Sequence, residues 1–165
     1  METTYILTAE MDEESFAWLN DLRRENFPAE RNFLPAHLTL FHRLSSAQVA
    51  ILHSIEVPPG PVDIRFDRIV FLGFCVAIHA SSPDLERLRD KARAQIRDEL
   101  SRQDIQPWKP HVTVQNKVSA ETARQLQQKL SDSFTARGGA VMGLLIWQYL
   151  GGPWKLADRI AFGKM

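Results

Sequence analysis

The sequence lacks the features that mark secreted or membrane-inserted proteins. It contains one cysteine, Cys75, among 165 residues, which excludes an internal disulfide and favours a reducing compartment. No apolar run approaches the roughly 20 residues that a membrane-spanning helix needs. The first residues, 1–4, lack the basic start of a signal peptide. These absences predict a cytoplasmic protein without a membrane partner.

Net charge is also missing. The chain carries 20 basic and 20 acidic side chains, so its formal net charge is zero. A long nucleic-acid footprint needs many lysines and arginines to neutralise phosphates, and we do not expect one here. A small nucleotide or the terminus of an RNA remains compatible as a substrate. The length fits a single domain over residues 1–165 with a substantial core, and we expect a monomer.

The most informative feature present is a four-residue phrase that occurs twice. Residues 37–40 read His-Leu-Thr-Leu and residues 111–114 read His-Val-Thr-Val. This period-two pattern predicts a half-buried strand in each case, with histidine and threonine on one face and the apolar pair on the other. Two such strands can surround one small anion from two sides. The candidate site residues are therefore His37, Thr39, His111 and Thr113.

The predicted elements alternate between strands and helices in an order that repeats. Strands are expected at 5–9, 62–72, 74–80, 138–150 and 159–162, and helices at 12–26, 45–55, 82–100 and from 119 onward. Strand, helix, histidine phrase and helix thus occur twice. We therefore expect two similar lobes, each too small to close its own core, packed about a pseudo-twofold axis.

With these paired phrases the chain resembles the two-histidine phosphoesterase superfamily, and within it the 2′-5′ RNA ligase and RNA 2′,3′-cyclic phosphodiesterase group. The segment 68–73 and the proline before the second histidine support the resemblance. It implies an α+β fold in which two pseudo-symmetric α/β lobes with antiparallel sheets form a V-shaped central cleft. It also implies an acid–base phosphodiesterase that needs no metal and no nucleoside triphosphate as cofactor.

The residue types suit the opening of a 2′,3′-cyclic phosphate. In-line attack by water requires one group to take a proton from water and another to give one to the departing ribose oxygen. Histidine serves either role near neutral pH, because its ordinary pKa is about 6.5. His37 and His111 are the predicted catalytic residues, and Thr39 and Thr113 the predicted substrate-binding residues. The sequence leaves open which histidine is the acid and which ester bond breaks. A bell-shaped pH–rate curve with an optimum near neutrality is expected.

Other interpretations of the phrases stay open. The same site run in reverse joins 2′-5′ ends, so RNA ligation is a side activity to consider. A non-catalytic nucleotide or RNA-end binding module is the alternative from another class. A metal site is not expected, because the chain has no His-Glu-x-x-His helix and no cysteine pair. His37 and His42 are also predicted to face opposite sides of one strand.

Residues that flank the phrases are the remaining candidates. Phe41 and Gln115 follow the two phrases at equivalent positions and share the cleft face if the strands stay regular. Phe41 can then stack on a base or form a plain apolar rim. Lys117 either meets a phosphate or is simply solvated. Trp154, which follows Gly-Gly-Pro, can cover the cleft.

Overall fold

The computed structural model describes residues 2–96 and 99–163. In this part of the chain the strands are β1 (Tyr5–Met11), β2 (Thr39–Leu44), β3 (Val62–Phe71), β4 (Val76–Ser81), β5 (His111–Gln115), β6 (Arg137–Tyr149) and β7 (Trp154–Ala161). The helices are α1 (Glu13–Asn26), α2 (Ser46–Leu52), α3 (Pro83–Gln95), α4 (Arg102–Ile105) and α5 (Ala120–Ser133), with a 3₁₀ turn η1 (Ala29–Arg31). None of these helices is both long and apolar enough to cross a membrane.

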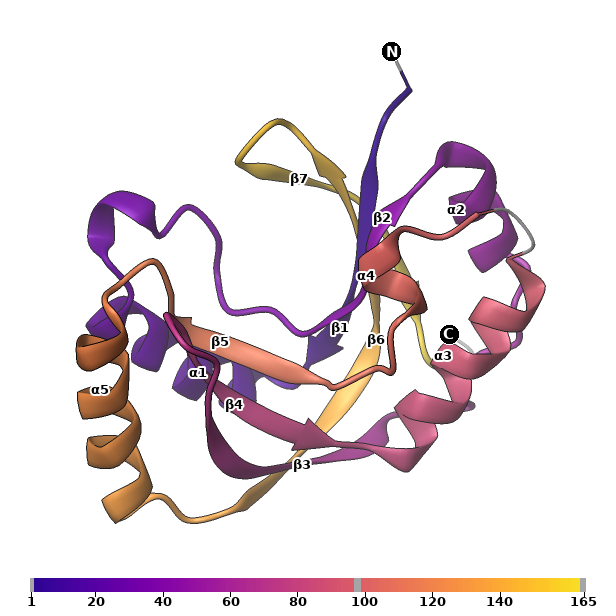
Figure 1. Cartoon of the computed structure of the whole chain (residues 1–165). Helices are drawn as coiled ribbons and strands as arrows, with labels where there is room; N and C mark the ends of the chain where they lie inside the picture. The colour runs from indigo at the N-terminus through magenta and orange to yellow at the C-terminus, as the bar shows by residue number, and fades with distance from the viewer. Residues whose placement is uncertain (1, 97–98, 164–165) are drawn as a thin grey trace.

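The strands form one continuous antiparallel sheet with a symmetric order. The order is β2-β1-β6-β3-β4-β5, and β7 also pairs with β6. The first half of the chain supplies β1, β2 and β3, and the second supplies β4, β5 and β6. If β1, β2 and β3 trade places with β4, β5 and β6, the strand order of the sheet reads the same from its opposite edge. This arrangement confirms the prediction of two pseudo-symmetric lobes (Figure 1). The third strand of each unit pairs with the first strand of the other, so the two lobes share one sheet.

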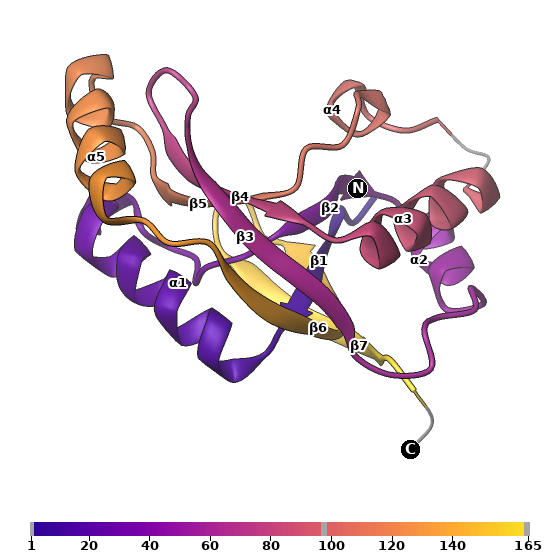
Figure 2. The ribbon, with the colours of Figure 1, turned by 90° about the horizontal axis from the view of Figure 1, so that it is seen from below.

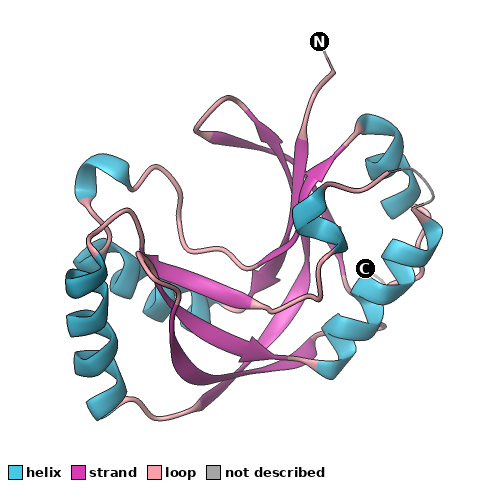
Figure 3. Ribbon diagram, viewed as in Figure 1, coloured by secondary structure: helices cyan, strands magenta, loops and turns pink. Residues whose placement is uncertain are grey.

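The sheet curls until its two terminal regions meet. Leu38 and Val112, equivalent residues of the two phrases, form an isolated antiparallel bridge. Figure 3 shows the strands of both lobes curving around the middle of the molecule. Helices α1 and α5 lie on one flank of the sheet, and α2 and α3 lie on the other (Figure 2). The pseudo-twofold relation therefore places the two phrases side by side.

Local capping signals fix where the helices begin. The Asp12 carboxylate accepts a hydrogen bond from the Ser15 N–H ahead of α1. Ser45 and Gln48 form the predicted capping box at α2. Ser82 and Ser119 cap α3 and α5 through their hydroxyl oxygens. Each satisfies a main-chain N–H that the first helical turn leaves free, so these helix starts were readable from sequence.

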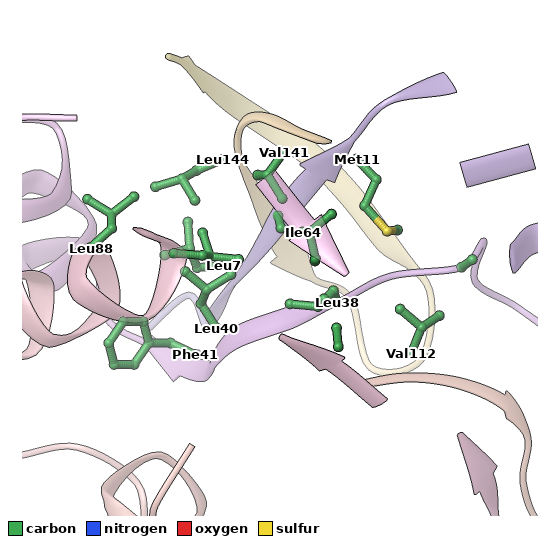
Figure 4. Close-up of a cluster of buried hydrophobic side chains, with 14 of the residues drawn as sticks. Leu7, Met11, Leu38, Leu40, Phe41, Ile64, Leu88, Val112, Val141 and Leu144 are labelled. Carbon is green, nitrogen blue, oxygen red and sulfur yellow. The ribbon is translucent and has the colours of Figure 1, made fainter. Parts of the chain in front are cut away.

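The apolar residues of both phrases anchor them in the core. All four are buried, with exposed fractions of 0–1% for Leu38, Leu40, Val112 and Val114. In Figure 4, Leu38, Leu40 and Val112 lie among buried side chains from other strands. Burial of an aliphatic side chain contributes about 1.5–3 kcal/mol. The core thus holds each phrase so that its histidine and threonine face the other way.

Several predicted element boundaries were wrong. The first phrase enters its strand only at Thr39, so His37 precedes β2. Helix α3 was predicted to reach Leu100 but ends at Gln95, because the backbone of residue 96 is extended. Residues 97–98 lie outside the described part of the chain. The short α4 was missed. Strand β7 begins at Trp154 rather than near Arg159, because a tight turn with Gly151 at φ +89° pairs it with β6 at once.

Candidate active site

A cavity of about 400 Å³ contains all four predicted site residues. His37 and Thr39 line it from the first phrase, and His111 and Thr113 from the second. The bridge between Leu38 and Val112 is the cause of this convergence. Because neighbouring residues of a strand point to opposite faces, burying the bridged pair turns the flanking polar side chains into the cavity.

Both histidines are oriented by a carbonyl two residues earlier in the chain. His37 Nδ1 lies 2.9 Å from the Pro35 carbonyl oxygen, and His111 Nδ1 lies 2.7 Å from that of Lys109. A carbonyl oxygen only accepts, so each Nδ1 donates its hydrogen. Each imidazole is thereby left with Nε2 for a ligand. The equivalence of the two arrangements follows the pseudo-twofold relation of the units.

The electrostatic surroundings of His37 favour its neutral form. Burial is the main cause that lowers its pKa to about 4, although the bond to the Pro35 carbonyl opposes the shift. The positive charges of Arg23, His42 and His111 lower the pKa further. At neutral pH the His37 ring is therefore uncharged and can accept a proton at Nε2.

Tryptophans form part of the cavity wall. The Trp154 ring lies 4.7 Å from the His37 ring, centroid to centroid, and 6.1 Å from that of Trp147. Trp154 stands at the start of β7, opposite Tyr149 of β6, and lines the cavity. Trp108, which precedes β5, donates from Nε1 to the Thr39 carbonyl oxygen of the first unit at 3.0 Å and lines the same cavity.

Two buried arginines join each unit to the phrase of the other. Arg23 of α1 is 4% exposed and donates to the Thr113 carbonyl oxygen at 2.9 Å. Arg89 of α3 is 3% exposed and donates to the Leu40 carbonyl oxygen at 2.8 Å. Burial lowers the pKa of Arg23 to about 10, so it stays cationic at neutral pH. Sequence reasoning missed their role, although Arg23 lies at helical spacing with the apolar face of its helix.

A buried carboxylate binds the part of β2 that follows the first phrase. Asp104 of α4 is 1% exposed and accepts from the main-chain N–H groups of His42 and Arg43 and from His42 Nδ1 at 3.0 Å. Burial opposes its ionisation, but the bonds from His42 and Arg43 outweigh it and hold the pKa of Asp104 below its ordinary value. Asp104 and His42 both line the cavity.

Some predictions about the flanking residues were wrong. His42 lines the same cavity as His37 rather than facing away. Phe41 is 0% exposed and packs under the Arg89 guanidinium, 4.6 Å from its ring centroid. Gln115 is 6% exposed, and its Oε1 has no hydrogen-bond partner among the described residues. Register shifts in the β1–β2 and β4–β5 pairings interrupt the alternation on which those predictions rested.

The described residues contain no group of three or more histidine, cysteine, aspartate or glutamate side chains placed to hold a metal ion. The His42 ring already uses Nδ1 for Asp104. What the cavity offers is two imidazoles with free Nε2 atoms, two threonine hydroxyls and nearby cationic charge. Such a set can bind an anion and move protons at opposite sides of it.

Comparison with known families agrees with this geometry. The family model described as the 2′-5′ RNA ligase superfamily matches residues 11–153. The chain belongs to the 2′-5′ RNA ligase superfamily. The superfamily is named for 2′-5′ RNA ligases, which supports an enzymatic role for this member. No curated protein sequence matches the chain.

Solved structures of other proteins share the superfamily fold. Escherichia coli LigT in complex with 3′-AMP has a TM-score of 0.67 and 16% identity, and the match covers 99% of this chain and 100% of LigT. TT0787 of Thermus thermophilus has a TM-score of 0.67 and 16% identity, covering 96% and 97% of the two chains. LigT has also been crystallised with ATP and with NADP+. At these identities the likeness shows the shared fold.

Proposed function

We propose that the protein is a metal-independent phosphodiesterase that opens 2′,3′-cyclic phosphates of RNA ends or small nucleotides. His37 and His111 are the proposed acid–base pair, and Thr39 and Thr113 the proposed phosphate ligands. The observation that carries the proposal is their convergence in one cavity with both Nδ1 atoms committed to main-chain carbonyls. Membership of the 2′-5′ RNA ligase superfamily supports the same chemistry.

The protonation of His37 suggests a role for each histidine. His37, with its pKa at about 4, is neutral at pH 7 and serves as the general base. It takes a proton from water as the water oxygen bonds to phosphorus. The bond from phosphorus to one ribose oxygen breaks, and His111 gives a proton to that oxygen. The product is a phosphate monoester, and exchange with solvent restores both rings.

The threonines and the buried cations stabilise the charge on phosphate. The Thr39 and Thr113 hydroxyls donate to the non-bridging oxygens from opposite sides of the cavity. Arg89 lines the cavity and Arg23 lies just behind Thr113. Positively charged groups held in place by main-chain bonds favour the transition state without rearranging during the reaction.

The decisive experiment is turnover of 2′,3′-cyclic nucleotides, cyclic-ended oligonucleotides and 2′-5′-linked dimers in excess EDTA. Release of monoester should survive chelation. H37A and H111A should each lose about 10²–10⁴-fold in kcat. H53A is the matched control, because His53 is an exposed histidine outside the cavity, paired with Asp158.

Other outcomes decide between the alternatives. Ligand binding without turnover of any compound would replace the proposal with a non-catalytic nucleotide-binding module. Joining of 2′-5′ ends would establish ligation as the reverse reaction of the same site. We also propose that the protein acts as a monomer.

A further inference from the structure

A second cavity, of about 500 Å³, adjoins the candidate active site. His37 and Thr113 line both cavities, so the two lie next to each other at the proposed phosphate position. The second cavity lies between the end of α1, the turn η1, the residues after β5 and the β6–β7 turn. A molecule whose reacting group lies between the two histidines can therefore extend directly into it.

The charged side chains that line this second cavity are all basic. Its lining includes Arg23, Arg31 and Lys117 and contains no aspartate or glutamate. This is unusual in a chain with equal numbers of acidic and basic residues. Arg31 and Lys117 are exposed, and among the described residues neither has a carboxylate within 4.0 Å. Two cations are thus free to bind an anion there.

The backbone of Lys117 adds an independent indication. Its φ of +60° makes it the one non-glycine residue in the described part of the chain with a left-handed backbone. This conformation disfavours side chains with a Cβ atom, and such residues concentrate at functional sites. The Asn116 side chain stabilises it by accepting a hydrogen bond from the Lys117 N–H at 2.8 Å. A lysine is held where glycine would be the easier choice.

Aromatic surfaces border the same two cations. Phe33 is 67% exposed and Tyr149 is 45% exposed, and both line the second cavity. Large rings left in water beside positive charge match the two parts of a nucleotide, since bases stack on aromatic faces and phosphates bind cations. The cavity therefore combines recognition of a phosphate with recognition of a flat ring.

We propose that this second cavity binds a second phosphate group of the substrate, through Arg31 and Lys117, next to the cyclic phosphate that reacts. The inference rests on the proposed function and deepens it. The second phosphate comes either from the 5′ position of a cyclic mononucleotide or from the backbone of a cyclic-ended oligonucleotide. Both present the same phosphate chemistry at the cavity.

The test compares a 2′,3′-cyclic nucleoside monophosphate with two relatives: one carrying a 5′-phosphate and a cyclic-ended dinucleotide. The wild-type enzyme should show about tenfold higher kcat/KM on at least one of the doubly phosphorylated compounds, as expected for a charge-assisted contact. R31A/K117A should remove this preference. K129A, an exposed lysine of α5 outside both cavities, is the matched control and should keep it.

The two doubly phosphorylated compounds identify the source of the phosphate. Preference for the dinucleotide, reduced by F33A, assigns the cavity to an RNA end whose next base stacks on Phe33. Preference for the 5′-phosphate compound, unchanged by F33A, assigns it to a mononucleotide. Equal kcat/KM on all three compounds, or a preference that R31A/K117A retains, overturns the inference.

A binding experiment separates failure of this inference from failure of the proposed function. If no cyclic compound is turned over, the proposed function fails. Calorimetric titration with non-cyclic 3′-phosphates, with and without the second phosphate, still decides the subsite. The second phosphate should tighten binding about tenfold in the wild type and not in R31A/K117A. Equal affinities would overturn the inference.

Discussion

Folding changes the protonation of His37, because it moves the imidazole into a covered position. Burial and neighbouring positive charge lower its pKa to about 4. We therefore predict that kcat/KM falls on the acid side only near pH 4–5, well below the ordinary imidazole range. Rates measured between pH 3.5 and 9.5, with chemistry limiting, test this. A profile flat over the whole range would contradict two-histidine catalysis.

The same depressed pKa makes stability depend on pH. The unfolded imidazole binds a proton at about pH 6.5 and folded His37 at about 4, so protons favour the unfolded chain in that interval. Stability should fall as pH drops from 6.5 to 4, by at most about 1.4 kcal/mol per unit from this group. Urea unfolding of wild type and H37Q at pH 7 and pH 5 measures it. Between pH 7 and pH 5, H37Q should lose less unfolding free energy than the wild type. Equal losses in the two proteins would show that His37 does not contribute.

At the residue scale, the sequence predicted where a polar side chain points when the residues next to it are apolar and buried. His37, Thr39, His111 and Thr113 share the cavity because their alternation is local and the apolar partners enforce it. Phe41 could not be placed, since a bulge turns its side chain inward and no local residue pattern marks a bulge of this kind.

Helix α1 holds the second phrase through Arg23. Its guanidinium bonds to the Thr113 carbonyl oxygen and also lowers the pKa of His37. We predict that R23M lowers kcat about 10- to 100-fold with a smaller change in KM, because the threonine and histidine shift out of alignment. Its acid limb should also move to higher pH. R24M is the control, since Arg24 is exposed on the same helix; an unchanged kcat and pH profile in R23M would show that Arg23 only fills space.

Helix α4 is fastened to the edge of β2 by Asp104. D104N removes the charge that three donors from His42 and Arg43 share, and we predict a loss of about 2 kcal/mol of unfolding free energy at pH 7. The pKa of Asp104 is lowered by folding, so its contribution is present above the unfolded carboxyl pKa and is lost as pH falls through the folded value. The difference between wild type and D104N should therefore shrink in acid. D84N, at an exposed position on α3, controls for loss of charge.

Elements with a local signal were predicted well and elements defined by distant contacts were not. The starts of α1, α2, α3 and α5 follow from their capping residues. Helix α4 is a single turn held by its bonds to β2, and its own residues give little periodicity. The early start of β7 depends on pairing with β6 in the same way.

At the scale of the whole molecule, the exchanged third strands predict one cooperative unit. Each lobe needs β3 or β6 from the other half of the chain to complete its part of the sheet. We expect far-UV circular dichroism and tryptophan fluorescence to report a single coincident unfolding transition in urea. Two separated transitions would show that the lobes fold independently and that residues 1–165 are not one domain.

The repeated order of elements predicted the two lobes, but it could not predict how they are joined. Pairing partners of strands are set by the whole chain, so the exchange of β3 and β6 between units leaves no trace in either unit's own sequence. The V-shaped cleft was expected from the resemblance to the two-histidine phosphoesterases, whereas the sheet shared between the lobes was not expected.

The bridge between Leu38 and Val112 lies where the two halves of the molecule meet. Both side chains are 0% exposed, so neither can change without disturbing the other. A polar or much larger side chain at either position would therefore displace both histidines and both threonines at once, because a single contact holds the two phrases together.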